Sequence, residues 1–189
     1  MQTVSNAFDA AYWQARYATP GRTGWDAGRT TPPLRAYFDQ LLVAQQPRIL
    51  IPGAGRAHEA EYLHRLGFCH VVVADLAPEP LAELAARVPD FPKENLWLAD
   101  FFALPPTEQF DLLIEQTFFC AINPSLRPAS AQQCAALLGV GRAASWWACS
   151  SIPSLPGPAS RRSAAAAPNT ALTLRRISSL FTSTRRTTR

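Results

Sequence analysis

Three acidic residues end short apolar segments of this sequence, and a glycine turn ends a fourth such segment. The acids are Asp75, Asp100 and Glu115, and the turn contains Gly53 and Gly55, with Asp75 placed 20 residues after Gly55. A glycine turn lets a ligand approach the backbone closely, and an acid at this spacing can accept hydrogen bonds from ribose hydroxyl groups. Each feature alone could be a plain turn or a helix cap. Their order and spacing together predict a site for an adenosine-containing ligand.

The segments that position these residues alternate between strand and helix patterns. Short apolar runs predict strands at 48–51, 71–75, 96–100 and 110–115. Apolar residues at three-and-four spacing, with proline and glycine at the ends, predict helices at 32–42, 57–66, 78–88 and 128–138. This alternation predicts a doubly wound α/β domain whose parallel sheet has the strand order 3-2-1-4 and binds ligands at the carboxyl ends of its strands. We expect the last strands of such a fold to be missing.

The glycine turn departs from the common phosphate-binding patterns. His58 stands where the dinucleotide fingerprint has its third glycine, which argues against NAD, and no G-x-x-x-x-G-K-[ST] loop of a P-loop ATPase is present. S-adenosylmethionine has no phosphate and carries a positive sulfonium, which aromatic faces and carboxylates attract. A glycine turn surrounded by acids and aromatic residues therefore favours S-adenosylmethionine as the cofactor.

Longer segments resemble the thiopurine S-methyltransferase family. The similar stretches are YWQARY at 12–17, TGWD at 23–26, ILIPGAGR at 49–56, DFF at 100–102 and EQTFFCAINP at 115–124. The resemblance implies a Rossmann-like S-adenosylmethionine-dependent methyltransferase that transfers a methyl group to a small soft nucleophile. The implied acceptor is a small-molecule thiol, a thiopurine or a halide.

The resemblance assigns eight residues to the cofactor: Trp13, Trp25, Gly53, Gly55, Asp75, Asp100, Phe101 and Gln116. It implies that the tryptophans close over the cofactor and the glycines lie under its methionine part. Asp75 would hold the ribose, Asp100 and Phe101 would frame the adenine, and Gln116 would touch the methionine end. The tryptophans and Phe101 could instead be core residues. No catalytic residue and no metal ligand are assigned, because a displacement that neutralises charge needs no dedicated acid or base.

Composition limits the setting of the protein. The chain has 189 residues, of which 48% are hydrophobic, and it has four cysteines with no C-x-x-C pair. It contains no run of about 18 apolar residues and no basic-then-apolar leader pattern at its start. We therefore expect a cytoplasmic monomer that contacts neither a membrane nor nucleic acid.

The charge divides the chain near residue 138. Ten basic and fourteen acidic residues precede this point, whereas residues 139–189 contain eight arginines and no acid. Reading the third base of each codon with the first two of the next can turn 141–155 into a Pro-Gly-Gly turn and an apolar strand. We therefore predict an incomplete cofactor-binding domain at 1–138 and a disordered, out-of-frame basic tail at 139–189. We expect the chain as given to be poorly folded and close to inactive. The alternative is a non-enzymatic remnant, or a nucleic-acid-binding protein that acts through its arginine-rich tail.

Overall fold

The sheet at the centre of the protein is built from the apolar segments that the sequence singles out. The structure, a computed structural model, describes residues 8–19, 23–138 and the backbone of 146–148, all within one compact unit, Met1–Ile152. The strands are β1 (Ile49–Pro52), β2 (Val71–Asp75), β3 (Leu96–Leu98), β4 (Leu112–Glu115) and β5 (Trp146–Ala148).

All strand pairs in this sheet are parallel, and the strand order is β3-β2-β1-β4-β5. In the register, Ile49 of β1 lies opposite Val71 of β2 on one side and Leu112 of β4 on the other. The predicted order of the first four strands is confirmed. Because the chain passes from β1 to β2 on one side and later returns to β4 on the other, the carboxyl ends of these strands form a switch point where ligands bind.

The expectation that no strand follows β4 is wrong for residues 146–148. β5 pairs with β4, with residue Leu113 opposite Trp146 and Glu115 opposite Ala148. The edge of β4 offers backbone N–H and C=O groups, and a short extended segment can bond to them without the long apolar run that is typical of the other strands. The other residues of the predicted tail lie outside the described part of the chain.

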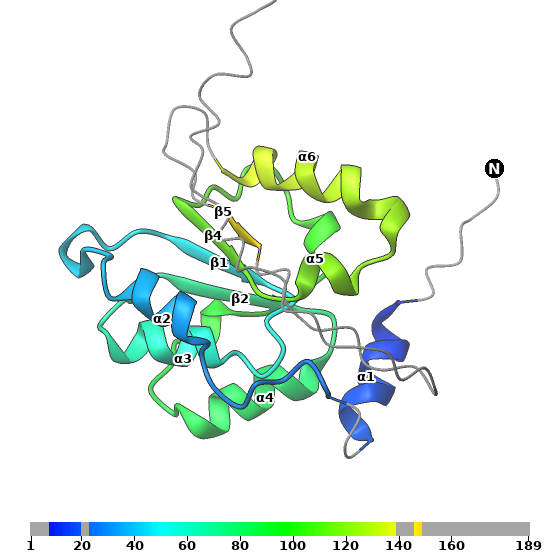
Figure 1. Ribbon diagram of the computed structural model, residues 1–189, viewed down its shortest axis with the longest axis horizontal. Coiled ribbons are helices and arrows are strands. Elements are labelled where there is room, and N and C mark those ends of the chain that lie inside the picture. Colours follow the sequence, from blue (N-terminus) through cyan, green and yellow to red (C-terminus); the bar gives the residue numbers. More distant parts are fainter. Residues whose placement is uncertain (1–7, 20–22, 139–145, 149–189) are drawn as a thin grey trace, which may run out of the picture. The chain divides into compact units, whose positions relative to one another are not determined.

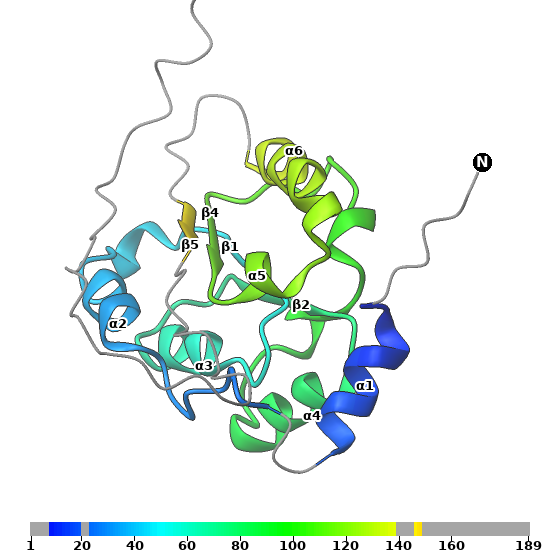
Figure 2. The same ribbon diagram turned by 45° about the vertical axis from the view of Figure 1, so that its right-hand side comes forward.

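Helices cover both faces of the sheet (Figures 1 and 2). The α-helices are α1 (Ala10–Ala18), α2 (Pro32–Phe38), α3 (His58–Arg65), α4 (Pro78–Arg87), α5 (Phe118–Ala121) and α6 (Arg127–Leu137). Four 3-10 turns are η1 (Val43–Gln45), η2 (Lys93–Asn95), η3 (Phe101–Ala103) and η4 (Pro124–Leu126). α2, α3 and α4 lie on one face, α6 lies on the other, and α1 lies beside α4 (Figure 2).

Alternation along the strands produces two apolar layers, one on each face of the sheet. Ile49, Ile51 and Val73 pack into the layer with α2, α3 and α4, whereas Leu50 and Val72 pack into the layer with α6. Both layers consist of nearly fully buried side chains, so the strands are held from both faces. The sheet therefore supplies a rigid platform for the loops at its carboxyl edge.

Several elements are shorter than the sequence predicts. The helix predicted over 32–42 ends at Phe38, because Asp39 caps it and the chain turns through η1 towards β1, leaving Leu42 62% exposed. The strand predicted over 96–100 ends at Leu98, and the strand predicted over 110–115 begins at Leu112. Among the described residues, no helix has the length and apolar character that a membrane span requires.

Candidate cofactor-binding site

Asp75 ends β2 with its carboxylate turned towards the glycine turn. The side chain is 7% exposed, and it accepts hydrogen bonds from the backbone N–H of Ala77 at 2.9 Å and of Gly55 at 3.3 Å. Burial raises the pKa of Asp75 to about 6, and these backbone donors limit the rise. The carboxylate thus joins the carboxyl ends of β1 and β2, where a ribose acceptor is expected.

The turn after β1 adopts a conformation that requires glycine at two positions. Gly53 has φ +54° and Gly55 has φ +55°, in the left-handed region that glycine occupies without steric penalty. A methyl group on Gly53 would overlap the ring of Phe118, whereas one on Gly55 would lie 3.6 Å from Tyr17 Oη and 3.8 Å from Trp25 Nε1. Gly53 therefore lies against a phenyl ring, and Gly55 lies under the N-terminal aromatic residues.

Aromatic side chains from α1 and from the following loop gather above Gly55. Asp9 caps α1 by accepting the backbone N–H of Tyr12 at 2.9 Å. The rings of Trp13 and Tyr17, one helical turn apart, meet the ring of Trp25 edge to face at centroid distances of 5.7 and 6.0 Å. Burial raises the pKa of Tyr17, and the nearby charge of Asp75 adds to the rise. This aromatic cluster forms a cover over the glycine turn.

The end of β4 contributes a buried acid and an amide. Glu115 is 2% exposed, and its carboxylate accepts the backbone N–H of Phe119 at 3.0 Å. Burial raises the pKa of Glu115, and the backbone donors of α5 oppose the rise. Gln116 points to the loop before α2, where the Thr31 hydroxyl donates to its Oε1 at 3.3 Å. Glu115 thus fixes the start of α5, and Gln116 connects β4 with the N-terminal segment.

Asp100 and Phe101 follow β3 and have different surroundings. Asp100 is exposed and caps η3, accepting the backbone N–H of Phe102 at 2.9 Å. Phe101 is 4% exposed and packs in the layer under α6, with its ring 5.2 Å from that of Phe118. Phe101 is thus a core residue whose edge reaches the ring beside Gly53.

The predicted residues therefore form linked groups along one edge of the sheet. Direct contacts link Trp13, Trp25, Gly55 and Asp75. A second chain of contacts runs from Gly53 through Phe118 to Phe101. Gln116 is tied to Thr31, and Asp100 bonds within its own loop.

Sequence reasoning did not select Tyr17 or Phe118 as site residues. Tyr17 belongs to the YWQARY stretch and Phe118 to the EQTFFCAINP stretch, so both lie in segments that were already singled out. The missing signal was spatial, because only the folded chain shows that these two rings lie against Gly55 and Gly53.

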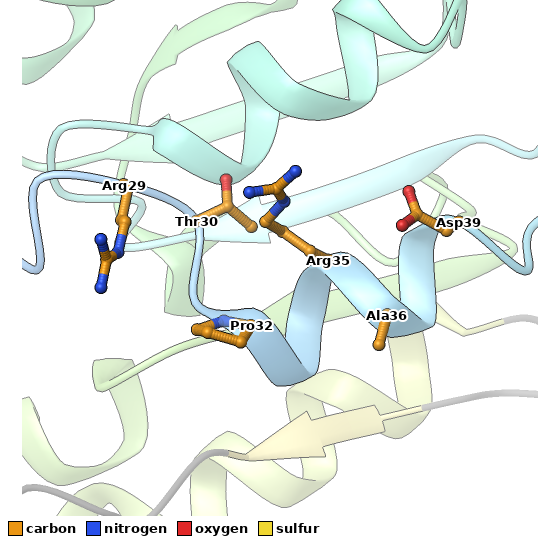
Figure 3. A pocket seen from close by; sticks show the side chains of 6 residues that line it. All are labelled: Arg29, Thr30, Pro32, Arg35, Ala36 and Asp39. Carbon is orange, nitrogen blue, oxygen red and sulfur yellow. The ribbon is translucent and has the colours of Figure 1, made fainter.

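A separate surface cavity of about 460 Å³ lies beside α2 (Figure 3). Its lining comes from α2 and the loop that precedes it: Arg29, Thr30, Pro32, Arg35, Ala36 and Asp39. The Arg35 guanidinium lies over the ring of Tyr62, 5.1 Å from its centroid. None of the eight predicted cofactor residues lines this cavity. Within the described part of the chain, no group of three His, Cys, Asp or Glu residues could hold a metal ion.

Solved structures with this arrangement of strands and helices define the class of the fold. The chain superposes on NodS, an N-methyltransferase from Bradyrhizobium japonicum in complex with S-adenosyl-L-homocysteine, with a TM-score of 0.51 and 14% identity over 72% of this chain and 71% of NodS. It superposes on the CcbJ methyltransferase from Streptomyces caelestis with a TM-score of 0.50 and 25% identity over 69% of this chain and 52% of CcbJ. The fold is that of the Rossmann-like methyltransferases, as expected.

Sequence comparison places the chain within one family of that class. The sequence model described as Thiopurine S-methyltransferase (TPMT) matches residues 8–144, so the chain belongs to the thiopurine S-methyltransferase family.

Named relatives come from plants and bacteria. Probable thiol methyltransferase 2 of Arabidopsis thaliana is 31% identical over 132 residues, which cover 68% of this chain and 55% of that protein. Thiocyanate methyltransferase 1 of Brassica oleracea is 34% identical over 124 residues, covering 62% and 53%. Thiopurine S-methyltransferase of Pseudomonas syringae pv. tomato is 27% identical over 145 residues, covering 68% and 65%. The chain thus spans between about half and two thirds of the length of these relatives.

Proposed function

We propose that this protein is an S-adenosylmethionine-dependent methyltransferase that acts on a small sulfur nucleophile or a halide. The observation that carries the proposal is the family match over residues 8–144, which contains every residue of the candidate site. The named relatives are called thiol, thiocyanate and thiopurine methyltransferases, and all three names specify a sulfur acceptor. A small thiol is therefore the first acceptor to test.

The residues at the edge of the sheet fit this cofactor. A buried carboxylate, Asp75, is available to accept hydrogen bonds from ribose hydroxyl groups. Gly53 and Gly55 have the positive φ that glycine adopts without strain, and they form the turn over which the methionine part would lie. Trp13 and Trp25 would present aromatic rings to the positive sulfonium. Asp100, Phe101 and Gln116 stay proposed contacts of the adenine and of the methionine end.

The contribution of the chain to the reaction is binding, orientation and exclusion of water. S-adenosylmethionine, when bound, supplies the methyl group that the acceptor takes in one in-line displacement. The glycine turn and Asp75 fix the cofactor on the sheet side, and the aromatic cover keeps water away from the opposite side. The acceptor reacts as an anion, a thiolate that has lost its proton to solvent or a halide, and S-adenosylhomocysteine is the leaving group. Positioning in a dry pocket can supply about 7–11 kcal/mol of the displacement barrier. We assign no catalytic residue.

We further propose that the cofactor-binding part of the enzyme lies in residues 1–138 and that the sequence after residue 138 is translated out of frame. The sheet accepts three residues of the following segment as β5, and residues 149–189 lie outside the described part of the chain. Sequencing the DNA across codons 134–145 tests this proposal directly. A reading frame that agrees with the present chain would leave the basic tail as a real segment.

Activity is tested with the purified chain in two measurements. Binding of S-adenosylhomocysteine is followed by titration calorimetry, and transfer is followed from labelled S-adenosylmethionine to a small thiol, a thiopurine, thiocyanate and iodide. We expect binding by the chain as given, and faster transfer after the reading frame is restored. A chain with restored frame that binds no S-adenosylhomocysteine, or that transfers no label to any of these acceptors, would refute the proposed function.

A further inference from the structure

Asp26 bonds on two sides to the segment that follows the glycine turn. Its Oδ2 lies 2.9 Å from Arg56 Nε, and its Oδ1 lies 3.0 Å from His58 Nε2. The same Oδ1 accepts the backbone N–H of Gly28 at 2.7 Å, which closes the loop on itself. The side chain of Asp26 is only 16% exposed, so solvent screens these contacts less than those of a surface ion pair. We name Asp26, Arg56 and His58 the clamp.

The far side of the clamp is itself fixed to the helices under the sheet. Arg56 pairs through Nη1 with Glu83 of α4 at 2.6 Å, and its carbonyl accepts a hydrogen bond from Arg87 of the same helix at 2.7 Å. Thr30, four residues after Asp26, donates its hydroxyl to the carbonyl oxygen of His58 at 2.8 Å. Asp26 thus contacts Arg56, which α4 holds in place, and His58, the first residue of α3.

The clamp joins the neighbours of two predicted cofactor residues. Asp26 follows Trp25 directly, and Arg56 follows Gly55 directly. Trp25 Nε1 lies 3.8 Å from the position of a methyl group on Gly55. The ion pair between Asp26 and Arg56 therefore lies one residue along the chain from Trp25 on one side and from Gly55 on the other.

We propose that Asp26 is a positioning residue for the cofactor, and that it acts by holding Trp25 over Gly55. The inference rests on the proposed function, because it concerns the same binding site. Both oxygens of the carboxylate are used, so an asparagine would keep the shape but lose the charge and one acceptor. Such a change should loosen the loop at 23–30 without removing any group that touches the ligand.

The test compares Asp26→Asn with the wild-type chain by titration with S-adenosylhomocysteine. We expect Asp26→Asn to raise the Kd about tenfold, in the range of coupling between contacting residues. Asp90→Asn is the matched control, because Asp90 forms a carboxylate–imidazole pair with His64 at 3.1 Å outside the site. That variant should bind with the wild-type Kd. Thermal unfolding of each variant establishes that the compared chains are folded.

A double-mutant cycle separates positioning from a general structural effect. If Asp26 acts through Trp25, then Asp26→Asn should change the Kd less than about twofold in a Trp25→Ala background. A tenfold loss in both backgrounds, or no loss in the wild-type background, would overturn the inference. If the wild-type chain and the frame-restored chain both fail to bind, the proposed function is refuted. If the wild-type chain binds but the cycle gives either contrary result, only the role of Asp26 is refuted.

Arg56→Lys gives a second check that does not alter the loop. A lysine retains the positive charge but cannot pair with Asp26 and Glu83 through two separate nitrogens as Arg56 does. We expect an intermediate Kd, between those of the wild-type chain and Asp26→Asn. A Kd for Arg56→Lys equal to the wild-type value would show that the clamp does not set the affinity.

Discussion

Replacement of Asp75 by asparagine should weaken cofactor binding and remove its pH dependence. The carboxylate of Asp75 is buried, and it accepts the backbone N–H groups of Gly55 and Ala77. An asparagine can keep one of these bonds but offers no second acceptor to a ribose hydroxyl. Hydrogen bonds to a charged group contribute about 1.5–3 kcal/mol each, so the Kd for S-adenosylhomocysteine should rise roughly 10- to 100-fold.

The pH dependence follows from the raised pKa of Asp75. Burial moves the pKa from 3.8 to about 6 in the unliganded protein. The ribose hydroxyls donate to the ionised form, so the competent fraction falls as the pH drops through 6. At pH 5 only about one tenth of the molecules carry the carboxylate, and the apparent Kd should therefore be roughly tenfold weaker than at pH 8.

As the pH falls, the unfolding free energy of the unliganded chain should rise, whereas its affinity for the cofactor should fall. Because the pKa of Asp75 is higher in the folded than in the unfolded chain, the folded state binds more protons and gains stability as the pH falls from 7 towards 4. The shift corresponds to a destabilisation of the fold by about 3 kcal/mol at pH values above 6. Asp75→Asn removes this destabilisation, so the variant should lose affinity while its unfolding free energy at pH 7 does not fall by a comparable amount.

Calorimetric titration of both proteins with S-adenosylhomocysteine at pH 5, 6, 7 and 8 tests these statements. The ligand keeps its own charge state over this range, and Asp75→Asn controls for other groups that titrate. A wild-type Kd that is constant between pH 5 and 8, or an equal pH dependence in Asp75→Asn, would refute the role assigned to this carboxylate.

Three further outcomes can be checked by similar means. Gly53→Ala and Gly55→Ala should carry the same backbone strain, about 1 kcal/mol, but only the new methyl group at 53 overlaps Phe118. Urea unfolding should therefore show that Gly53→Ala loses about 1–3 kcal/mol more unfolding free energy than Gly55→Ala, and equal losses would contradict this. Glu59 is 8% exposed, and burial raises its pKa to about 7. Glu59→Gln should therefore raise the unfolding free energy by about 2–3 kcal/mol at pH 8 and by far less at pH 5. A gain of equal size at both pH values would argue against burial as the cause. Restoring the reading frame should raise methyl transfer to a thiol at least about a hundredfold, and equal rates would contradict the frame hypothesis.

The parts of the fold that sequence alone could predict are those determined by local pattern. Apolar runs located four strands, because a strand buried on both faces must be apolar along its length. Alternation with helices then fixed the parallel order, and the acid at the end of β2 indicated Asp75. These features depend on a few consecutive residues, so periodicity could reveal them.

The parts that could not be predicted depend on contacts between distant residues. β5 pairs with β4 through backbone groups, and its sequence lacks the pattern of the other strands. The contact of Phe118 with Gly53 and the bonds of Asp26 with Arg56 join segments about 30 or more residues apart. No repeat or spacing in the sequence encodes such pairs.

The two sides of the candidate site are stabilised by different means. Asp75 and the start of the glycine turn are fixed by buried strands, whereas none of the residues of α1 is buried, and a nine-residue helix has little stability of its own. α1 is held over the site by its packing beside α4 and by the contacts of Trp13 and Tyr17 with Trp25, the residue that precedes Asp26. The role proposed for Asp26 therefore predicts that the affinity for the cofactor depends on how firmly the loop at 23–30 is held, as well as on the groups that touch the ligand.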